Sequence, residues 1–165
     1  MAFSRASEAV IAKKTFPDPT DIYGRAKLLG EPRIPNAVTL RTSMIGHELR
    51  GSEGLLEWFL TQAEGCNCFS RAVFSGLPTV VLAQIVRDYV LPRPELAGIY
   101  HVAAHPISKC ELLRLIAVTY NKQIEINEQE GPPIDRSLNA DKFRRETGYA
   151  PPDWPTLVQT MHSHR

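Results

Sequence analysis

Tyr23 and Lys27 stand four residues apart in the stretch DIYGRAKLLGE, residues 21–31. In a helix that begins near Asp21 or Ile22, this spacing puts both side chains on one face, one turn apart. An ammonium group close to a phenol favours the phenolate form, which makes the phenol a usable proton donor or acceptor near neutral pH. An ordinary surface pair would have the same spacing, so spacing alone does not distinguish a catalytic pair from a structural one.

The residues around this pair favour a ligand-binding role. Residues 18–21 combine a turn with a helix N-cap signal, and Gly24 beside the tyrosine leaves room for a ligand. The unit PDPTDIYGRAKLLGE, residues 17–31, resembles the active-site helix of the extended short-chain dehydrogenase/reductase family, part of the NAD-dependent epimerase/dehydratase superfamily. Within that family it is most similar to the dTDP-4-dehydrorhamnose reductase and NDP-sugar epimerase/dehydratase branch.

The resemblance implies an NAD- or NADP-dependent reductase of a nucleotide-activated sugar, or an epimerase or dehydratase of such sugars. In a reductase, hydride would pass from the nicotinamide to a 4-keto carbon while Tyr23 protonates the developing alkoxide. Lys27 would stabilise the phenolate and hold the nicotinamide ribose, so both residues are expected to contact the cofactor. The family also uses a Ser or Thr upstream of the tyrosine. Ser4 and Ser7 are the nearest candidates, although neither follows an apolar strand.

Residues 37–46, AVTLRTSMIG, have the pattern of a buried strand that ends at a glycine. This segment resembles the family strand with the motif L-R-x-S, whose carboxyl end faces the nicotinamide and the sugar. The resemblance implies that Arg41 and Ser43 contact the cofactor and that Thr42 contacts the substrate. The alternative for each residue is a polar side chain that only faces a neighbouring helix.

Three further residues are expected to bind the substrate. An amphipathic helix from Leu55 to about residue 63 carries Trp58, which either stacks on a base or sugar or packs in the core. Residues 131–139, GPPIDRSLN, resemble a family segment from which an arginine and a serine reach the sugar nucleotide, here Arg136 and Ser137. A guanidinium group suits a diphosphate because it forms bidentate hydrogen bonds. A surface salt bridge is the alternative for Arg136.

The remaining hydrophobic pattern predicts an α/β fold. Ser108 and Glu111 have the spacing of a capping box, and Gly148 is placed to end a helix. His101 lies within an apolar run and is expected to be a core histidine. Besides the Tyr23 helix, helices are expected at about 55–63, 80–91, 108–120, 140–147 and 156–162, and strands at 37–46, 72–79, 98–104 and 122–127.

The sequence contains no G-x-G-x-x-G or G-x-x-G-x-x-G motif, the turn that holds a dinucleotide pyrophosphate. The resemblance therefore covers about the C-terminal half of the family fold. It implies the C-terminal portion of a Rossmann-type parallel sheet, interleaved with a small α+β substrate-binding cap. Residues 1–46 and 78–104 are assigned to the NAD(P)-binding part, and residues 47–77 and 105–165 to the cap.

Two functional hypotheses follow. The first is an N-terminally truncated or split enzyme that is inactive alone and associates with a complementing N-terminal chain or as a homodimer. The second is a non-catalytic regulatory or partner subunit that retains the fold. Either would expose surface that the other half of the fold covers.

Composition restricts the possible partners and the compartment. The 165 residues carry a net charge of +1, which gives no electrostatic reason to expect nucleic acid or an anionic membrane as a partner. No window approaches the length of an apolar membrane span, and residues 1–5 lack an apolar signal region. Three cysteines, an odd number, do not suggest a disulfide framework, and Cys66 and Cys68 have no second ligand pair for zinc. We expect a cytoplasmic protein without a metal.

Overall fold

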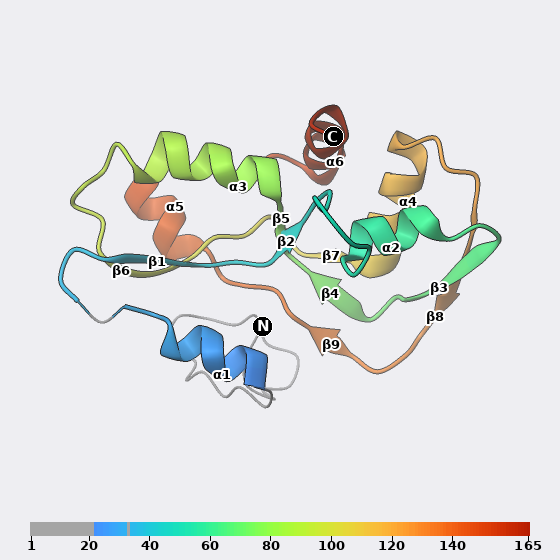
Figure 1. Ribbon diagram of the computed structural model, residues 1–165, viewed down its shortest axis with the longest axis horizontal. Helices are drawn as coiled ribbons and strands as arrows, with labels where there is room; N and C mark the ends of the chain where they lie inside the picture. Colours follow the sequence, from blue (N-terminus) through green and yellow to red (C-terminus); the bar gives the residue numbers. More distant parts are fainter. Residues whose placement is uncertain (1–21, 33) are drawn as a thin grey trace.

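Pairs of short parallel strands form the framework of the molecule (Figure 1). The computed structural model describes residues 22–32 and 34–165. In this part of the chain, three two-stranded sheets are all parallel: β1 (Val38–Arg41) with β6 (Gly98–His101), β2 (Met44–Ile45) with β5 (Leu77–Pro78), and β3 (Gly65–Phe69) with β8 (Glu125–Gln129). The fourth sheet has the order β7–β4–β9, in which β4 (Ala72–Phe74) is antiparallel to β7 (Ile107–Ser108) and parallel to β9 (Ile134–Asp135).

The helices lie close to their predicted positions. They are α1 (Ile22–Leu29), α2 (Leu55–Thr61), α3 (Thr79–Ile85) with a following π-helical turn η1 (Val86–Val90), α4 (Lys109–Thr119), α5 (Asp141–Thr147) and α6 (Trp154–Ser163). In Figure 1, α3, α5 and α6 lie on one side of the strands, while α1 lies on the opposite side. The predicted α/β fold class is confirmed. The division into a NAD(P)-binding part and a cap stays a prediction.

Two helix ends confirm the capping signals. The Ser108 side chain accepts the N–H of Glu111, and the Glu111 carboxylate accepts the N–H of Ser108, so the capping box before α4 is complete. Gly148 ends α5 in the left-handed conformation, with φ of 75°. The last helix begins two residues earlier than predicted because Asp153 caps it by accepting the N–H of Thr156.

The strands differ from their predicted positions more than the helices do. The single strand predicted at 37–46 is interrupted at Thr42 and Ser43, so β1 and β2 belong to different sheets. Strands β3, β7 and β9 were not predicted. The polar sequence GCNCF of β3 becomes a strand because it pairs with β8, 60 positions further along the chain, and no local pattern reports such a partner.

The core lies where α6 packs on α3 and on α4, and where these helices pack on the short strands. Its largest fully buried side chains include those of Phe59, Leu77, Leu112, Phe143 and Leu157. His101 is also buried, as predicted for a core histidine. Among the described residues, no helix has both the length and the apolar character needed to cross a bilayer.

A network of polar side chains ties the segment after β2 to α2 and α4. His47 Nδ1 lies 2.9 Å from Glu57 Oε1, and His47 Nε2 lies 2.9 Å from the Tyr120 hydroxyl. Burial raises the pKa of Tyr120 to about 12, so its hydroxyl stays protonated within this network.

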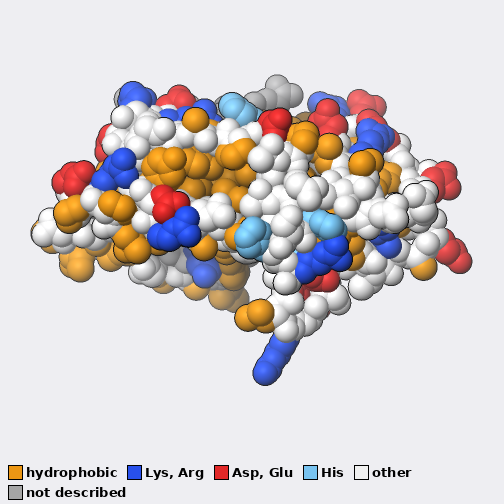
Figure 2. Space-filling model, turned by 90° about the horizontal axis from the view of Figure 1, so that it is seen from above, with side chains coloured by type: hydrophobic (Ala, Val, Ile, Leu, Met, Phe, Trp, Pro, Cys, Tyr) orange, Lys and Arg blue, Asp and Glu red, His pale blue; other side chains and the backbone are white. Residues whose placement is uncertain are grey.

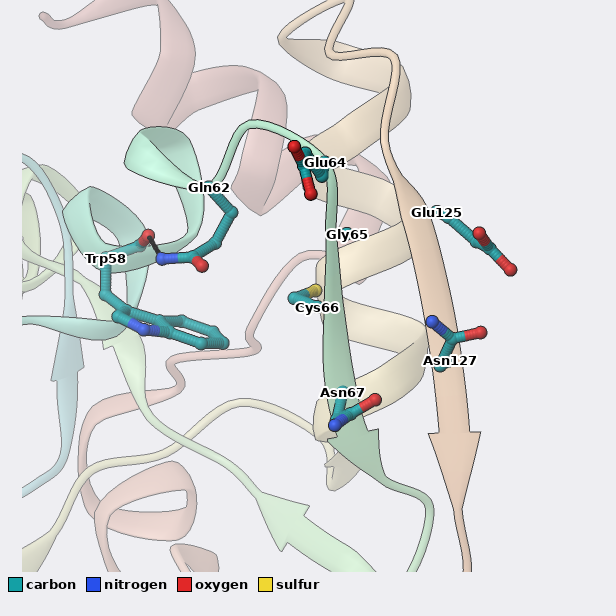
Figure 3. A pocket seen from close by; sticks show the side chains of 8 residues that line it. All are labelled: Trp58, Gln62, Glu64, Gly65, Cys66, Asn67, Glu125 and Asn127. Carbon is teal, nitrogen blue, oxygen red and sulfur yellow. Dashed lines mark hydrogen bonds between the residues drawn. The ribbon is translucent and has the colours of Figure 1, made fainter.

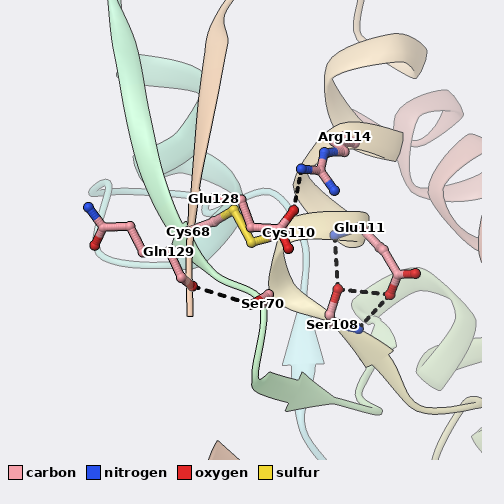
Figure 4. The surroundings of a disulfide bond; sticks show 8 residues. All are labelled: Cys68, Ser70, Ser108, Cys110, Glu111, Arg114, Glu128 and Gln129. Atoms are coloured by element: carbon pink, nitrogen blue, oxygen red, sulfur yellow. Dashed lines mark hydrogen bonds and ion pairs between the residues drawn. A yellow bond between two sulfur atoms is a disulfide. The ribbon is translucent and has the colours of Figure 1, made fainter. Parts of the chain in front are cut away.

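One disulfide corrects the expectation drawn from the cysteine count. Cys68 on β3 is bonded to Cys110 in the first turn of α4, with a Cα–Cα distance of 5.3 Å (Figure 4). Cys66 is free and buried, and burial raises the pKa of its thiol. An odd count leaves one cysteine unpaired but does not exclude a bridge between the other two. The side-by-side placement of β3 and α4 decides that pairing.

Candidate functional site

The predicted proton-transfer pair lies on α1. The Lys27 Nζ is 5.3 Å from the centroid of the Tyr23 ring, which confirms that the two side chains share one face of the helix. Both side chains are exposed, with 62% of Tyr23 accessible. Gly24 beside the tyrosine is buried. The pair is therefore formed by the helix alone and is open to a ligand.

An ion pair connects the segment after α1 to the end of β1. Arg41 Nε lies 2.7 Å from Glu31 Oε1, and Arg41 Nη2 lies 2.8 Å from Glu31 Oε2. This bidentate geometry is the strongest form of a guanidinium–carboxylate contact, and both side chains are largely buried. Arg41 thus fixes the chain between the Tyr23 helix and the sheet. The predicted cofactor contact of Arg41 stays a prediction.

The segments that follow four strands meet at one place, which we call the strand-end junction: residues 42–43, 75–76, 103–104 and 136–138. Leu77 N donates to Ser43 O at 2.9 Å, and Ala104 N donates to Ser75 O at 2.9 Å. Leu138 N donates to Ser75 Oγ, also at 2.9 Å. The carboxyl ends of the parallel pairs β1–β6 and β4–β9 come together here, and open α/β sheets commonly bind ligands at the carboxyl ends of parallel strands.

Gly76 is required by the close approach of two chain segments in this junction. A Cβ atom at position 76 would lie 2.6 Å from Ser43 O and 2.3 Å from the end of the Phe74 ring. Both distances are shorter than any ordinary contact with a carbon atom. Sequence reasoning missed Ser75 and Gly76, although a serine and a glycine directly after a strand were the available signal.

The strand-end junction contains four of the residues predicted to bind ligand. Thr42 Oγ1 donates to Ser43 O at 3.0 Å, and Ser43 is buried. Ser137 is fully buried, its N–H donates to Asp135 Oδ1 at 2.8 Å, and its hydroxyl has no hydrogen-bond partner among the described residues. Arg136 beside it is exposed. The structure thus groups Thr42, Ser43, Arg136 and Ser137, and leaves one buried hydroxyl available.

Trp58 does not lie at the strand-end junction. It lines a hollow formed by the end of α2, β3 and β8, and none of the other predicted site residues lines that hollow (Figure 3). Its side chain is 37% exposed, so the core alternative for this tryptophan is wrong. Ser4 and Ser7, the nearest candidates for the upstream serine, lie outside the described residues.

Charge is spread evenly over the face that Figure 2 shows. Lys, Arg, Asp and Glu side chains alternate there around a group of hydrophobic side chains, and no single sign dominates. Among residues 22–32 and 34–165, no group of three or more His, Cys, Asp or Glu side chains is placed to hold a metal ion.

Solved structures with a similar fold include enzymes named for nucleotide-activated sugars. The chain is similar to a dTDP-4-dehydrorhamnose reductase from Clostridium acetobutylicum, with a TM-score of 0.78 and 18% identity over 98% of this chain and 62% of that one. It is similar to UDP-N-acetylglucosamine 4-epimerase from Bacillus cereus, with a TM-score of 0.76, 18% identity and the same coverage. It is also similar to dTDP-4-dehydrorhamnose reductase from Bacillus anthracis in complex with NADP, with a TM-score of 0.75 and 18% identity over 92% of this chain and 58% of that one.

These comparisons establish the fold. It is the α/β fold that the resemblance to extended short-chain dehydrogenases/reductases predicts, and the chain spans about three-fifths of the length of these three structures. In sequence, no family model matches the chain, and the comparison with curated proteins finds no significant match.

Proposed function

We propose that this chain supplies the proton-transfer pair and the sugar-binding residues of an NAD- or NADP-dependent enzyme acting on a nucleotide-activated sugar. The reaction would be reduction of a 4-keto group, as in dTDP-4-dehydrorhamnose reductases, or epimerisation or dehydration of the sugar. The observation that carries this proposal is the exposed Tyr23–Lys27 pair, 5.3 Å from ammonium to ring, in a chain with this fold.

Each residue of the pair has a defined task in this proposal. The Tyr23 hydroxyl donates its proton to the sugar oxygen as negative charge develops on that oxygen. The Lys27 ammonium stabilises the phenolate that remains, and it binds the ribose of the cofactor. A bound nicotinamide would supply or accept the hydride.

The strand-end junction provides the groups that would bind the sugar nucleotide. The Arg136 side chain is exposed and has no partner among the described residues, so its guanidinium group can bind a diphosphate. The Ser137 hydroxyl is buried and has no partner among the residues that the structure describes, a state that a ligand hydrogen bond would relieve. Thr42 and Ser43, at the end of β1, would complete the contacts with sugar and nicotinamide.

The chain fits the reactive end of the cofactor better than the pyrophosphate. Its sequence has no glycine-rich turn of the kind that cradles a pyrophosphate. We therefore propose that the 165 residues alone are inactive and that activity requires a complementing chain with a dinucleotide-binding unit. Among the described residues, β1 pairs only with β6, so its other edge is available to a further strand.

A second candidate is a non-catalytic partner subunit. The exposed apolar side chains of Ile22, Leu29 and Ile34, on and just after α1, favour association through this side of the molecule. In that case a partner would cover Tyr23 and Lys27 rather than leave them open to a sugar.

The experiment that tests the proposal is equilibrium binding of NADH and NADPH to the purified chain, followed by nucleotide fluorescence. We expect no binding by the chain alone. We expect reductase, epimerase or dehydratase activity after a dinucleotide-binding chain is added, and loss of that activity in Tyr23→Phe. Micromolar binding by the chain alone would refute the proposal that it needs a complementing chain to bind the dinucleotide. An active complex that is insensitive to Tyr23→Phe would refute the catalytic role.

A further inference from the structure

A hollow of about 580 Å³ lies between the end of α2 and the β3–β8 ribbon (Figure 3). Its polar and aromatic lining comes from Trp58, Gln62, Glu64, Asn67, Glu125 and Asn127. The hollow is open to solvent, and its lining comes from α2, β3, β8 and the connection between α2 and β3. The Cys68–Cys110 disulfide anchors β3 to α4 behind it.

Trp58 gives the hollow an aromatic surface. Helix α2 buries Leu56 and Phe59 in the core, which leaves Trp58 on a different side of the helix and 37% exposed. The Gln62 amide donates to Trp58 O at 2.9 Å, and Figure 3 shows its side chain beside the indole. The indole N–H has no hydrogen bond to any described residue, so both ring and donor are available to a ligand.

Two amides stand next to each other on the ribbon. Asn67 of β3 is in register with Asn127 of β8, and both are exposed on the same face. Neither side chain has a hydrogen-bond partner among the described residues. Position 65 is a glycine, so no side chain covers the strand there. The Asn127 amide nitrogen lies 3.9 Å from the place that a Cβ atom on Gly65 would occupy. Each amide offers a donor and an acceptor, which matches neighbouring hydroxyl groups.

The charges of the lining restrict the ligand. Glu64 and Glu125 both contribute carboxylates, and no Lys or Arg is among the described residues that line the hollow. The nearby Lys122 ammonium is bound to Leu60 O and Gln62 O. A phosphate or carboxylate would therefore be repelled. A quaternary ammonium ion is disfavoured because it is recognised by several aromatic faces, and this hollow has one.

We propose that this hollow binds an uncharged sugar ring, which stacks on Trp58 and forms hydrogen bonds through its hydroxyl groups to Asn67 and Asn127. This site is separate from the strand-end junction and is independent of the proposed enzymatic function. Its ligand is a free sugar or a terminal sugar of a glycan, without a phosphate group.

The test uses intrinsic fluorescence and ligand-observed NMR on the full chain. The chain has two tryptophans, and Trp154 is buried with its Nε1 donating to His105 O at 2.7 Å. Trp58 therefore reports on the hollow. The probes are the methyl glycosides of glucose, galactose and N-acetylglucosamine, with sorbitol as a polyol that lacks a ring. We expect at least one glycoside to bind saturably, with a dissociation constant of about 1–10 mM, and sorbitol not to bind.

Single-residue variants test whether the glycoside binds in the hollow. Saturation-transfer NMR should show loss of the bound glycoside in Trp58→Ala, and an affinity lower by about fivefold in Asn67→Ala and in Asn127→Ala. Phe69→Ala removes another exposed aromatic side chain, on strand β3 with Asn67 but outside the lining of the hollow, and should leave binding unchanged. Circular dichroism checks that each variant is folded.

Several outcomes would overturn the inference. These are an absence of saturable binding up to about 100 mM for every glycoside, an equal loss in Phe69→Ala and Trp58→Ala, and tighter binding of glucose 6-phosphate or tetramethylammonium than of the glycosides. Tyr23→Phe separates this site from the proposed active site. If that variant abolishes glycoside binding, the sugar binds at the active site and the hollow is not its site.

Discussion

The backbone N–H of Leu138 donates to the hydroxyl of Ser75 at 2.9 Å, and thereby joins the segment after β9 to the segment after β4. Ser75 is 1% exposed, and its own carbonyl accepts the N–H of Ala104. One serine thus connects three strand ends in the strand-end junction. This contact also distinguishes Ser75 from the neighbouring Ser137, whose hydroxyl has no partner in the described structure.

Ser75→Ala should destabilise the fold by about 1–3 kcal/mol, because it leaves the buried N–H of Leu138 without an acceptor. The measurement is the urea midpoint of unfolding. Ser70→Ala is the matched control, since Ser70 is only half-buried and its hydroxyl makes a long 3.4 Å bond to Gln129 O. Equal midpoints for the two variants would contradict the role assigned to Ser75.

Ser137→Ala should have the opposite effect on the free chain. Removing an unpartnered buried hydroxyl should leave the unfolding free energy within about 0.5 kcal/mol of wild type, or raise it. In a complemented enzyme the same variant should weaken binding of the sugar nucleotide. A loss of stability as large as that of Ser75→Ala would show that Ser137 serves the fold rather than the ligand.

The disulfide should be visible as a thiol count. Alkylation of the unfolded, unreduced protein should modify one cysteine, Cys66, and alkylation after reduction should modify all three. Replacing Cys68 and Cys110 with serine should lower the unfolding free energy by about 2–4 kcal/mol. Cys66→Ala, in which the bridge stays intact, is the comparison. Three reactive thiols without reductant would show that the bridge does not form.

The capping box before α4 should make stability depend on pH. The hydrogen bonds from the Ser108 side chain and backbone lower the pKa of Glu111. Its carboxylate therefore contributes stability above its ordinary pKa, and this contribution is lost as the pH falls through the lower pKa of the folded state. Ser108→Ala should cost about 0.5–2 kcal/mol at pH 7.

Denaturation midpoints at pH 7 and pH 3 test the sign of this effect. Glu111→Gln should lose less stability than wild type over that interval, because it has no carboxylate to protonate. Glu53→Gln, at an exposed position, should lose as much as wild type. If Glu111→Gln and wild type lose equal stability, the capping contact does not contribute to the pH dependence.

Local sequence signals predicted local structure well. The Ser108–Glu111 spacing, the glycine at 148 and the Tyr23–Lys27 spacing each specify a feature within a few residues, and all three are present. Features made by distant segments were missed or misjudged. Strand β3, the Cys68–Cys110 bridge and the exposed position of Trp58 depend on which elements pack together, and no short window of sequence contains that information.

The residues of the candidate site show the same difference between what the sequence predicts and what contacts between distant segments decide. The resemblance named Thr42, Ser43, Arg136 and Ser137, which the structure brings together at the strand-end junction, and their ligand-binding roles stay predictions. It also named Trp58, which lines a separate hollow. The role of Ser75 was missed because a buried serine is recognised only by the segments it connects.

The parallel pairings have a consequence for how the chain acquires its structure. Positions 38 and 98, 65 and 125, and 72 and 134 are partners, so these three pairings each join residues 60 or more positions apart. Contacts this distant in sequence slow folding, because a long loop must close before the pairing stabilises it. On the ribosome, β1, β3 and β4 would all emerge before their partners exist. Nascent chains would therefore hold unpaired strands until the partner strands have been synthesised, and chaperone binding would matter most before then.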